Sequence, residues 1–155
     1  MIQFSGMKCI SLWQPWASLV AIGAKRIETR SWSTRYRCPL AIHAAKYYSM
    51  NTADYASSSP CADVLRIAGL EWGRLPFGGI VAVAYLFDVA PTASVDSYRL
   101  SPALHEKEFG DYRPGRFAFL LGNIKPLKQM IPYRAHQGLF NLDADVISQV
   151  WRAAA

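Results

Sequence analysis

The sequence predicts a mainly β fold of the α+β class, a closed or nearly closed β-barrel with short helices at its mouth. About five or six short apolar segments have the residue types of strands, and the helical segments between them are few and short. The regular alternation of strand and helix that builds a doubly wound sheet is absent. Because no linker or internal repeat divides the chain, we expect one domain over residues 1–155.

The first half of the chain alternates three expected strands with one helix. Residues 8–13 are crowded with β-prone apolar side chains and predict a strand. Apolar side chains then recur at helical spacing and predict a helix that begins at Pro15. Gly23 is well suited to end this helix. Residues 25–32 alternate apolar and charged side chains as a strand with one wet face does, and residues 39–45 form a compact apolar strand.

Beyond residue 45, polar breaks separate further expected elements. The strands expected there are 80–89, 116–121 and 126–133. The helices expected there are 61–69, a short acidic one at 104–109, and 143–151. Asp143 suits the N-cap of the last helix because its carboxylate accepts from free backbone N–H groups.

Composition places the chain among globular proteins that need neither disulfides nor metal. Hydrophobic residues make up 52% and charged residues 18% of the sequence. Its three cysteines are odd in number and form no Cys-x-x-Cys pair, which favours a reducing, cytoplasmic setting and no zinc site. No apolar run is long enough for a membrane helix. We expect a cytoplasmic monomer with no cofactor and no membrane partner.

The charge balance favours an anionic partner. Seventeen Lys and Arg against eleven Asp and Glu leave a net charge of +6, with a pI of about 9.4. RNA or a nucleotide-like ligand is the expected partner, and an acidic protein is the alternative. The expected centre of positive potential contains one acid, Glu28, among the cations Lys25, Arg26, Arg30, Arg35 and Arg37.

The segment from Gly23 to Arg30 is the first candidate site. On a regular strand Lys25 and Glu28 point to opposite faces, so they converge only if Lys25 still belongs to the preceding turn. If they converge, the ammonium and the carboxylate can hold a phosphate or a base edge. The alternative is a solvated surface salt bridge.

A second candidate site surrounds the start of the first helix. Trp13, Gln14 and Trp16 place two indoles and a carboxamide there, and single-strand binders stack bases on such aromatic faces. The alternative is that both indoles belong to the core.

Two more features are compatible with an anion or with catalysis. His43 shares a strand face with two alanines, which leave room for a cavity, although a structural histidine is the commoner case. Residues 110–116 have glycines at 110 and 115 but lack the Lys-Ser/Thr ending of a phosphate loop. This segment predicts a tight turn from which Arg113 and Arg116 can still reach an anion.

Together these segments resemble the ASCH family, a branch of the PUA-like superfold. The likeness extends over residues 7–132 and leaves 133–155 as a C-terminal extension with a helix. Its parts are Gln14-Pro15-Trp16-Ala17, Gly23-x-Lys25-x-x-Glu28-x-Arg30, the 39–46 strand, the strand from Ile80, and Gly115-Arg116-Phe117-Ala118-Phe119.

The resemblance implies a PUA-like β-barrel whose polar cleft binds RNA or a nucleotide. Some relatives are linked to RNA cleavage, and one branch hydrolyses acylated cytidine with a threonine where this chain has Glu28. In a ribonuclease Lys25 would stabilise the phosphorane while Glu28 or His43 takes the 2′-hydroxyl proton. Binding ranks first, metal-independent ribonuclease second and nucleoside amidohydrolase third. The expected ligand contacts are Gln14, Trp16, Lys25, Arg26, Glu28, Arg30, Arg35, Arg113 and Arg116.

Overall fold

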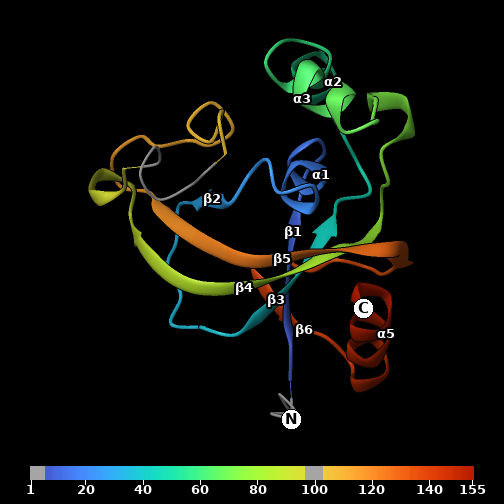
Figure 1. Ribbon diagram of the computed structural model, residues 1–155. Helices are drawn as coiled ribbons and strands as arrows, with labels where there is room; N and C mark the ends of the chain where they lie inside the picture. Colours follow the sequence, from blue (N-terminus) through green and yellow to red (C-terminus); the bar gives the residue numbers. More distant parts are fainter. Residues whose placement is uncertain (1–5, 97–102) are drawn as a thin grey trace.

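A computed structural model describes residues 6–96 and 103–155 (Figure 1). The strands are β1 (Lys8–Leu12), β2 (Ile27–Arg30), β3 (Pro39–Ala44), β4 (Gly79–Pro91), β5 (Phe117–Pro132) and β6 (Leu139–Asn141). The α-helices in these ranges are α1 (Trp16–Ala21), α2 (Met50–Ala56), α3 (Cys61–Ile67) and α5 (Ala144–Ala154). Single 3₁₀ turns lie at Trp72–Arg74 and Thr92–Ser94.

The strands form one mixed sheet in the order β2-β5-β4-β3-β1-β6. Only the β1–β3 pairing is parallel, and the pairings of β6 with β1, β4 with β3, β5 with β4 and β2 with β5 are antiparallel. The long strands β4 and β5 bend together through three register shifts and curl the sheet into a half-barrel (Figure 1). This arrangement confirms the mainly β, PUA-like fold, with the barrel open along one side.

The core lies on both faces of the sheet because side chains alternate along each strand. Ile10 and Ile42 face α1 and pack in a cluster with Val20, whereas Cys9 on the opposite face packs in a cluster with Val150 of α5. All five are at most 1% exposed. Burying a large aliphatic side chain is worth about 1.5–3 kcal/mol, so helices on both faces are needed to cover this sheet.

A third cluster joins α1 to the helical cap formed by α2 and α3. Leu19 of α1 packs in this cluster with Leu65 of α3 and Phe109. The helix α2 was not predicted; only Thr52 and Ala56 of its sequence MNTADYA are buried, and neither is a large apolar residue. Its start is fixed by a capping box in which Ser49 and Thr52 exchange hydrogen bonds.

Two sequence predictions differ from the structure, and one short strand was not predicted. The helix expected at 104–109 is wrong, because this segment forms successive turns whose polar groups bond to Lys25 and Arg26, just before β2. The strands expected at 116–121 and 126–133 are one bent strand, β5, which contains Asn123 with φ 46°. The three-residue strand β6 was not predicted, since its partner strand β1 is distant in sequence.

In the described residues no helix is long and apolar enough to cross a membrane. No group of three or more His, Cys, Asp or Glu side chains in those same ranges is arranged to hold a metal ion. All three cysteines are free thiols, and Cys9 and Cys61 are buried.

Candidate functional site

A hollow of about 870 Å³ lies beside the outer edge of β2, and we call it the first hollow. It is bounded by the end of β1 with the start of α1, by β2, by residues 108–116 and by residues 135–138. Its lining includes Ser11, Trp13, Trp16, Glu28, Thr29, Arg30, Tyr55, Glu108, Phe109, Gly110, Asp111, Arg116, Ala135, His136 and Gln137.

Aromatic side chains form one wall of the first hollow. Trp13 is 48% exposed, and Trp16 stacks on Tyr55 with ring centroids 5.0 Å apart and planes at 25°. The Tyr55 hydroxyl donates to the Glu108 carbonyl at 2.9 Å, and burial raises the pKa of Tyr55 to about 12, so the phenol keeps its proton near neutral pH. The wall therefore offers a neutral aromatic surface open to solvent at Trp13.

Strand alternation turns Glu28 and Arg30 into the first hollow. Ile27 before them and Thr29 between them are buried, although Thr29 still contributes to the lining. An Arg30 Nη2 donates to the Ser11 carbonyl at 2.8 Å and lies 3.9 Å from a carboxylate oxygen of Glu28. The other Glu28 oxygen accepts from the Thr29 backbone N–H at 2.9 Å. This pair leaves both polar heads in a half-buried position at the lining.

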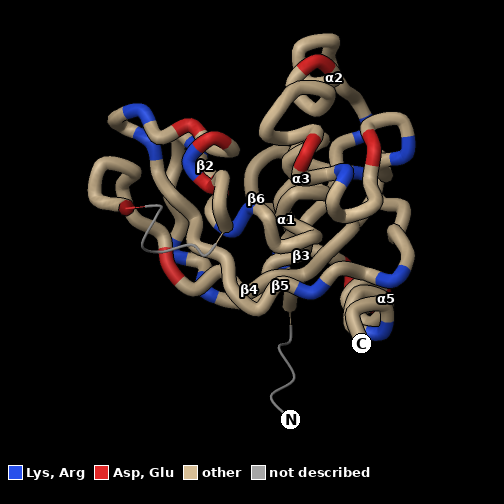
Figure 2. The backbone as a smooth tube through the Cα atoms, turned by 45° about the horizontal axis from the view of Figure 1, so that its top comes forward, with Lys and Arg blue, Asp and Glu red and all other residues tan. Residues whose placement is uncertain are grey.

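The lining of the first hollow carries mixed charge and is not purely basic. Its carboxylates are Glu28, Glu108 and Asp111, and its guanidiniums are Arg30 and Arg116. Figure 2 shows acidic and basic positions interspersed along the segments around β2. The net charge led us to expect a basic cleft, but the lining of this cavity carries charges of both signs.

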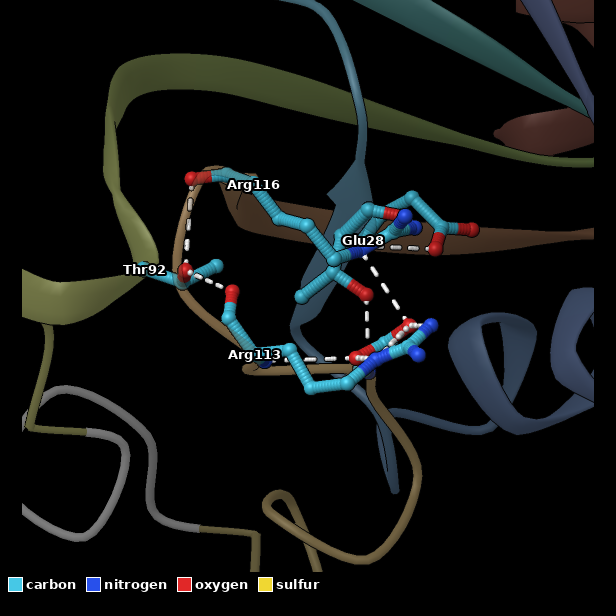
Figure 3. Close-up of polar contacts among 6 residues, drawn as sticks. Glu28, Thr92, Arg113 and Arg116 are labelled. Atoms are coloured by element: carbon cyan, nitrogen blue, oxygen red, sulfur yellow. Dashed lines mark hydrogen bonds and ion pairs between the residues drawn. The ribbon is translucent and has the colours of Figure 1, made fainter.

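The loop after Gly110 is held against β2 by polar contacts (Figure 3). The Asp111 N–H donates to the Thr29 hydroxyl at 2.9 Å, and an Arg116 Nη2 donates to the Thr29 carbonyl at 3.3 Å. Arg116 Nε lies 3.4 Å from the Asp111 carboxylate, although without hydrogen-bond geometry. Hydrogen bonds from Arg113 hold the pKa of Asp111 at about 2. The exposed Arg113 thereby orients Asp111 from outside the hollow.

The structure does not bring Lys25 and Glu28 together in the first hollow. Lys25 belongs to the turn before β2, as convergence required, but its side chain is 0% exposed. Its ammonium donates to the Ile27 carbonyl and, at 3.0 Å, to the Phe109 carbonyl. Beside it, the buried Glu106 carboxylate accepts from the Arg26 and Ile27 N–H groups at 2.7 and 2.8 Å. Lys25 thus holds Phe109, a lining residue of the first hollow, in place from the buried side.

Gln14 is also a structural residue in this geometry. It is 0% exposed, accepts from the Ser18 N–H at 3.0 Å, and donates at 2.8 Å to the Ser18 hydroxyl and the Pro76 carbonyl. Arg26 donates to the Gly23 carbonyl at 3.3 Å, and Arg35 is exposed outside the lining. Among the predicted contacts, the lining contains Trp16, Glu28, Arg30 and Arg116.

A second hollow of about 920 Å³ opens beside His43, between the ends of β3 and β5. Its lining is Ser11, His43, Ala45, Lys46, Tyr47, Phe77, Gly78, Met130, Pro132, Tyr133, Arg134 and Ala135. His43 is 1% exposed, with Nε2 2.7 Å from the Tyr133 carbonyl and Nδ1 2.9 Å from the Ser11 hydroxyl. Because a carbonyl only accepts, Nε2 carries the hydrogen and Nδ1 accepts from Ser11. Burial lowers the pKa of His43, which favours this neutral ring.

Sequence comparison places this architecture in a known family, because the ASCH domain model matches residues 10–118. The chain belongs to the ASCH family. Activating signal cointegrator 1 of Mus musculus and that of Homo sapiens are each 27% identical to this chain over 147 residues. These alignments cover 92% of this chain but only 23% of each relative.

Solved ASCH structures share the fold. The crystal structure of ASCH from Zymomonas mobilis superposes with a TM-score of 0.58 and 18% identity, covering 96% of both chains. A single-site mutant of that protein superposes with a TM-score of 0.56 and 16% identity, covering 96% of this chain and 99% of the other. These matches confirm the expected fold, and the domain model confirms the ASCH resemblance.

Several residues of the ASCH cavities were not predicted from sequence. Ser11 lines both hollows, and it does so because the β1–β3 register places it opposite His43, a pairing that the sequence does not show. Asp111 lies in the glycine-bounded loop of which only the arginines were expected to reach a ligand. Tyr55 and His136 reach the first hollow through tertiary packing, for which the local sequence carries no signal.

Proposed function

We propose that this ASCH domain binds single-stranded RNA or a nucleotide-like ligand in the first hollow. The observation that carries the proposal is the exposed indole of Trp13 beside the Trp16–Tyr55 stack, facing a polar rim of opposite charges. Stacking a base on an aromatic side chain is worth about 1–3 kcal/mol in single-strand binders. The aromatic wall therefore supplies affinity that does not depend on base identity.

The polar rim supplies the directional part of recognition. Glu28 and Asp111 accept hydrogen bonds from sugar hydroxyls or exocyclic amino groups, while Arg30 and Arg116 donate to base acceptors or to a phosphate. Three carboxylates against two guanidiniums disfavour a cluster of phosphates. The rim consequently suits the base and sugar of one nucleotide better than a run of backbone phosphates.

The decisive test is to remove the exposed indole. Trp13→Ala is expected to weaken binding of a labelled, mixed-sequence RNA octamer about 5- to 150-fold in fluorescence anisotropy. Trp151→Ala is the matched control, because Trp151 is similarly exposed at 40% but lies on α5 outside both linings. Equal affinities of Trp13→Ala and the parent protein would contradict the proposal.

A metal-independent ribonuclease is the second candidate, and the Ser11–His43 contact favours it. Ser11 lines both hollows, and its hydroxyl lies 2.9 Å from Nδ1 of the neutral His43 ring, so it could pass a 2′-hydroxyl proton to Nδ1. The 2′-oxygen would then attack phosphorus, and the 5′-oxygen would leave with a proton from water. Cleaved RNA that accumulates in EDTA with the parent protein, but not with His43→Gln, would establish this activity.

The amidohydrolase alternative receives less support from the residues beside Glu28. Thr29 is only 6% exposed, and its hydroxyl is engaged as the acceptor of the Asp111 N–H. A nucleophile needs an accessible hydroxyl next to a base. Incubation of the protein with an acylated cytidine, followed by mass spectrometry for free cytidine, tests this reaction.

A further inference from the structure

We infer that the second hollow is a separate subsite for the phosphate backbone of a strand whose nucleotide occupies the first hollow. The inference rests on the proposed function and adds the direction in which the strand continues. Lys46 and Arg134 are exposed cations in its lining. None of the lining residues, all of which the structure describes, carries a carboxylate. Its lining thus has the positive charge that the first hollow lacks.

The two cations are held near one another by the backbone. Lys46 follows β3 and Arg134 follows β5, and Gly78 bridges these two segments. The Gly78 N–H donates to the Ala44 carbonyl at 2.8 Å, and the Gly78 carbonyl accepts from the Tyr133 N–H at 3.2 Å. Because the segments are tied together just before both cations, a phosphate between them meets charges whose backbone positions are already fixed.

Aromatic side chains at the rim of the second hollow fit the base that accompanies such a phosphate. Tyr47 is 73% exposed, and the Lys46 ammonium lies 5.7 Å from the centre of its ring. Phe77 in the lining packs against Trp72 and Tyr48, with ring centroids 5.5 and 5.6 Å away. An aromatic cluster beside two cations is the combination that single-strand binding grooves use.

The two hollows meet at a shared wall. Ser11 and Ala135 line both, and Arg134 lines only the second hollow while His136 lines only the first. The Ser11 carbonyl accepts from Arg30 of the first hollow, and the Ser11 hydroxyl contacts His43 of the second. A strand longer than one nucleotide can therefore pass over Ser11 from one hollow to the other.

The test compares ligands of different length on a matched pair of double variants. Isothermal titration calorimetry would measure binding of the four nucleoside monophosphates and of a mixed-sequence RNA octamer. Lys46→Ala with Arg134→Ala removes both cations of the second hollow. Lys125→Ala with Lys128→Ala removes the same charge from exposed positions on β5 outside both hollows.

The inference predicts an effect that depends on ligand length. The first double variant should weaken octamer binding at least tenfold. It should also reduce the slope of log K against log salt by about 1.4, because each phosphate that a cation no longer neutralises lowers the slope by about 0.7. Its monophosphate affinities should equal those of the parent, and the control double variant should change neither ligand.

Each contrary outcome has a distinct meaning. Equal octamer affinities of the two double variants would overturn the phosphate subsite while leaving the first hollow as a nucleotide site. A parallel loss for octamer and monophosphates in the first double variant would overturn the division into two subsites. If neither ligand binds the parent protein, the proposed function fails, and the inference fails with it. Polyglutamate binding that needs Lys46 and Arg134, without octamer binding, would assign the surface to an acidic protein instead.

Discussion

The two hollows are similar in volume and share a wall, but they differ in charge. The first, about 870 Å³, combines three carboxylates with two guanidiniums, and the second, about 920 Å³, has Lys46 and Arg134 without a carboxylate. The net charge of +6 therefore does not predict the character of the cavity beside the basic motif. Local pairing decides which cations remain available to a ligand.

Lys25 shows why the motif contributes less positive charge than its sequence suggests. A buried ammonium is tolerated when its donors find acceptors, and two backbone carbonyls accept from two of its three N–H groups here. Lys46, by contrast, is exposed at the rim of the second hollow. Within one small domain, the lysine inside the family motif is built into the fold and a lysine outside it faces solvent.

The largest expected effect is the loss of stability when the buried Lys25 is replaced. Lys25→Met should lower the free energy of unfolding by about 1–3 kcal/mol for each of the two carbonyls left without a donor, measured by urea denaturation. Arg35→Met is the control, since Arg35 is exposed, and it should change stability by less than about 0.5 kcal/mol. A fully stable Lys25→Met protein with lost RNA affinity would instead make Lys25 a ligand contact.

A smaller effect should separate the first hollow from the second. At Gly110 a Cβ would lie 2.7 Å from Cε2 of Tyr112 and 3.3 Å from Cγ2 of Thr29, so Gly110→Ala must displace the first hollow's wall. We expect a cost of about 1–3 kcal/mol and weaker monophosphate binding. Gly73→Ala is the matched control, because nothing lies within 4 Å of its added Cβ. Unchanged monophosphate binding by a folded Gly110→Ala protein would argue against the first hollow as the nucleotide site.

The smallest expected effect is the pH dependence of stability that comes from His43, which contacts Ser11 in the wall between the hollows. Because burial lowers the pKa of His43, the folded state binds its proton less readily than the unfolded state does. The resulting stability is present above the unfolded pKa of about 6.5 and is lost as pH falls toward the folded value. His43→Gln should therefore flatten the decline of the urea midpoint below about pH 6.5. Identical pH profiles of His43→Gln and the parent would refute this assignment.

Much of the fold was predictable because its signals are local. Strand alternation in β2 places Glu28 and Arg30 on one side, as observed, and the apolar runs of β1, β3 and β4 were recognised by composition. The helix α2 was missed because a capping box starts it without an apolar stripe. The break predicted between two strands is a bend inside β5, which pairing with β4 keeps continuous.

The candidate site was predicted only in part, because its composition depends on tertiary contacts. Trp16, Glu28, Arg30 and Arg116 reach the first hollow from segments that the motif identified. The burial of Lys25 depends on the Phe109 carbonyl, 84 residues away in sequence. No pattern within the motif indicates that contact. The motif alone therefore could not show whether Lys25 binds a ligand or stabilises the fold.

The most direct test of nucleotide binding in the first hollow uses the five tryptophans as reporters. In NMR spectra recorded during titration with nucleoside monophosphates, the indole N–H signals of Trp13 and Trp16 should shift in a saturable manner. Those of Trp32, Trp72 and Trp151, which lie outside its lining, should stay in place. A saturable shift of Trp72 without shifts of Trp13 and Trp16 would contradict the account.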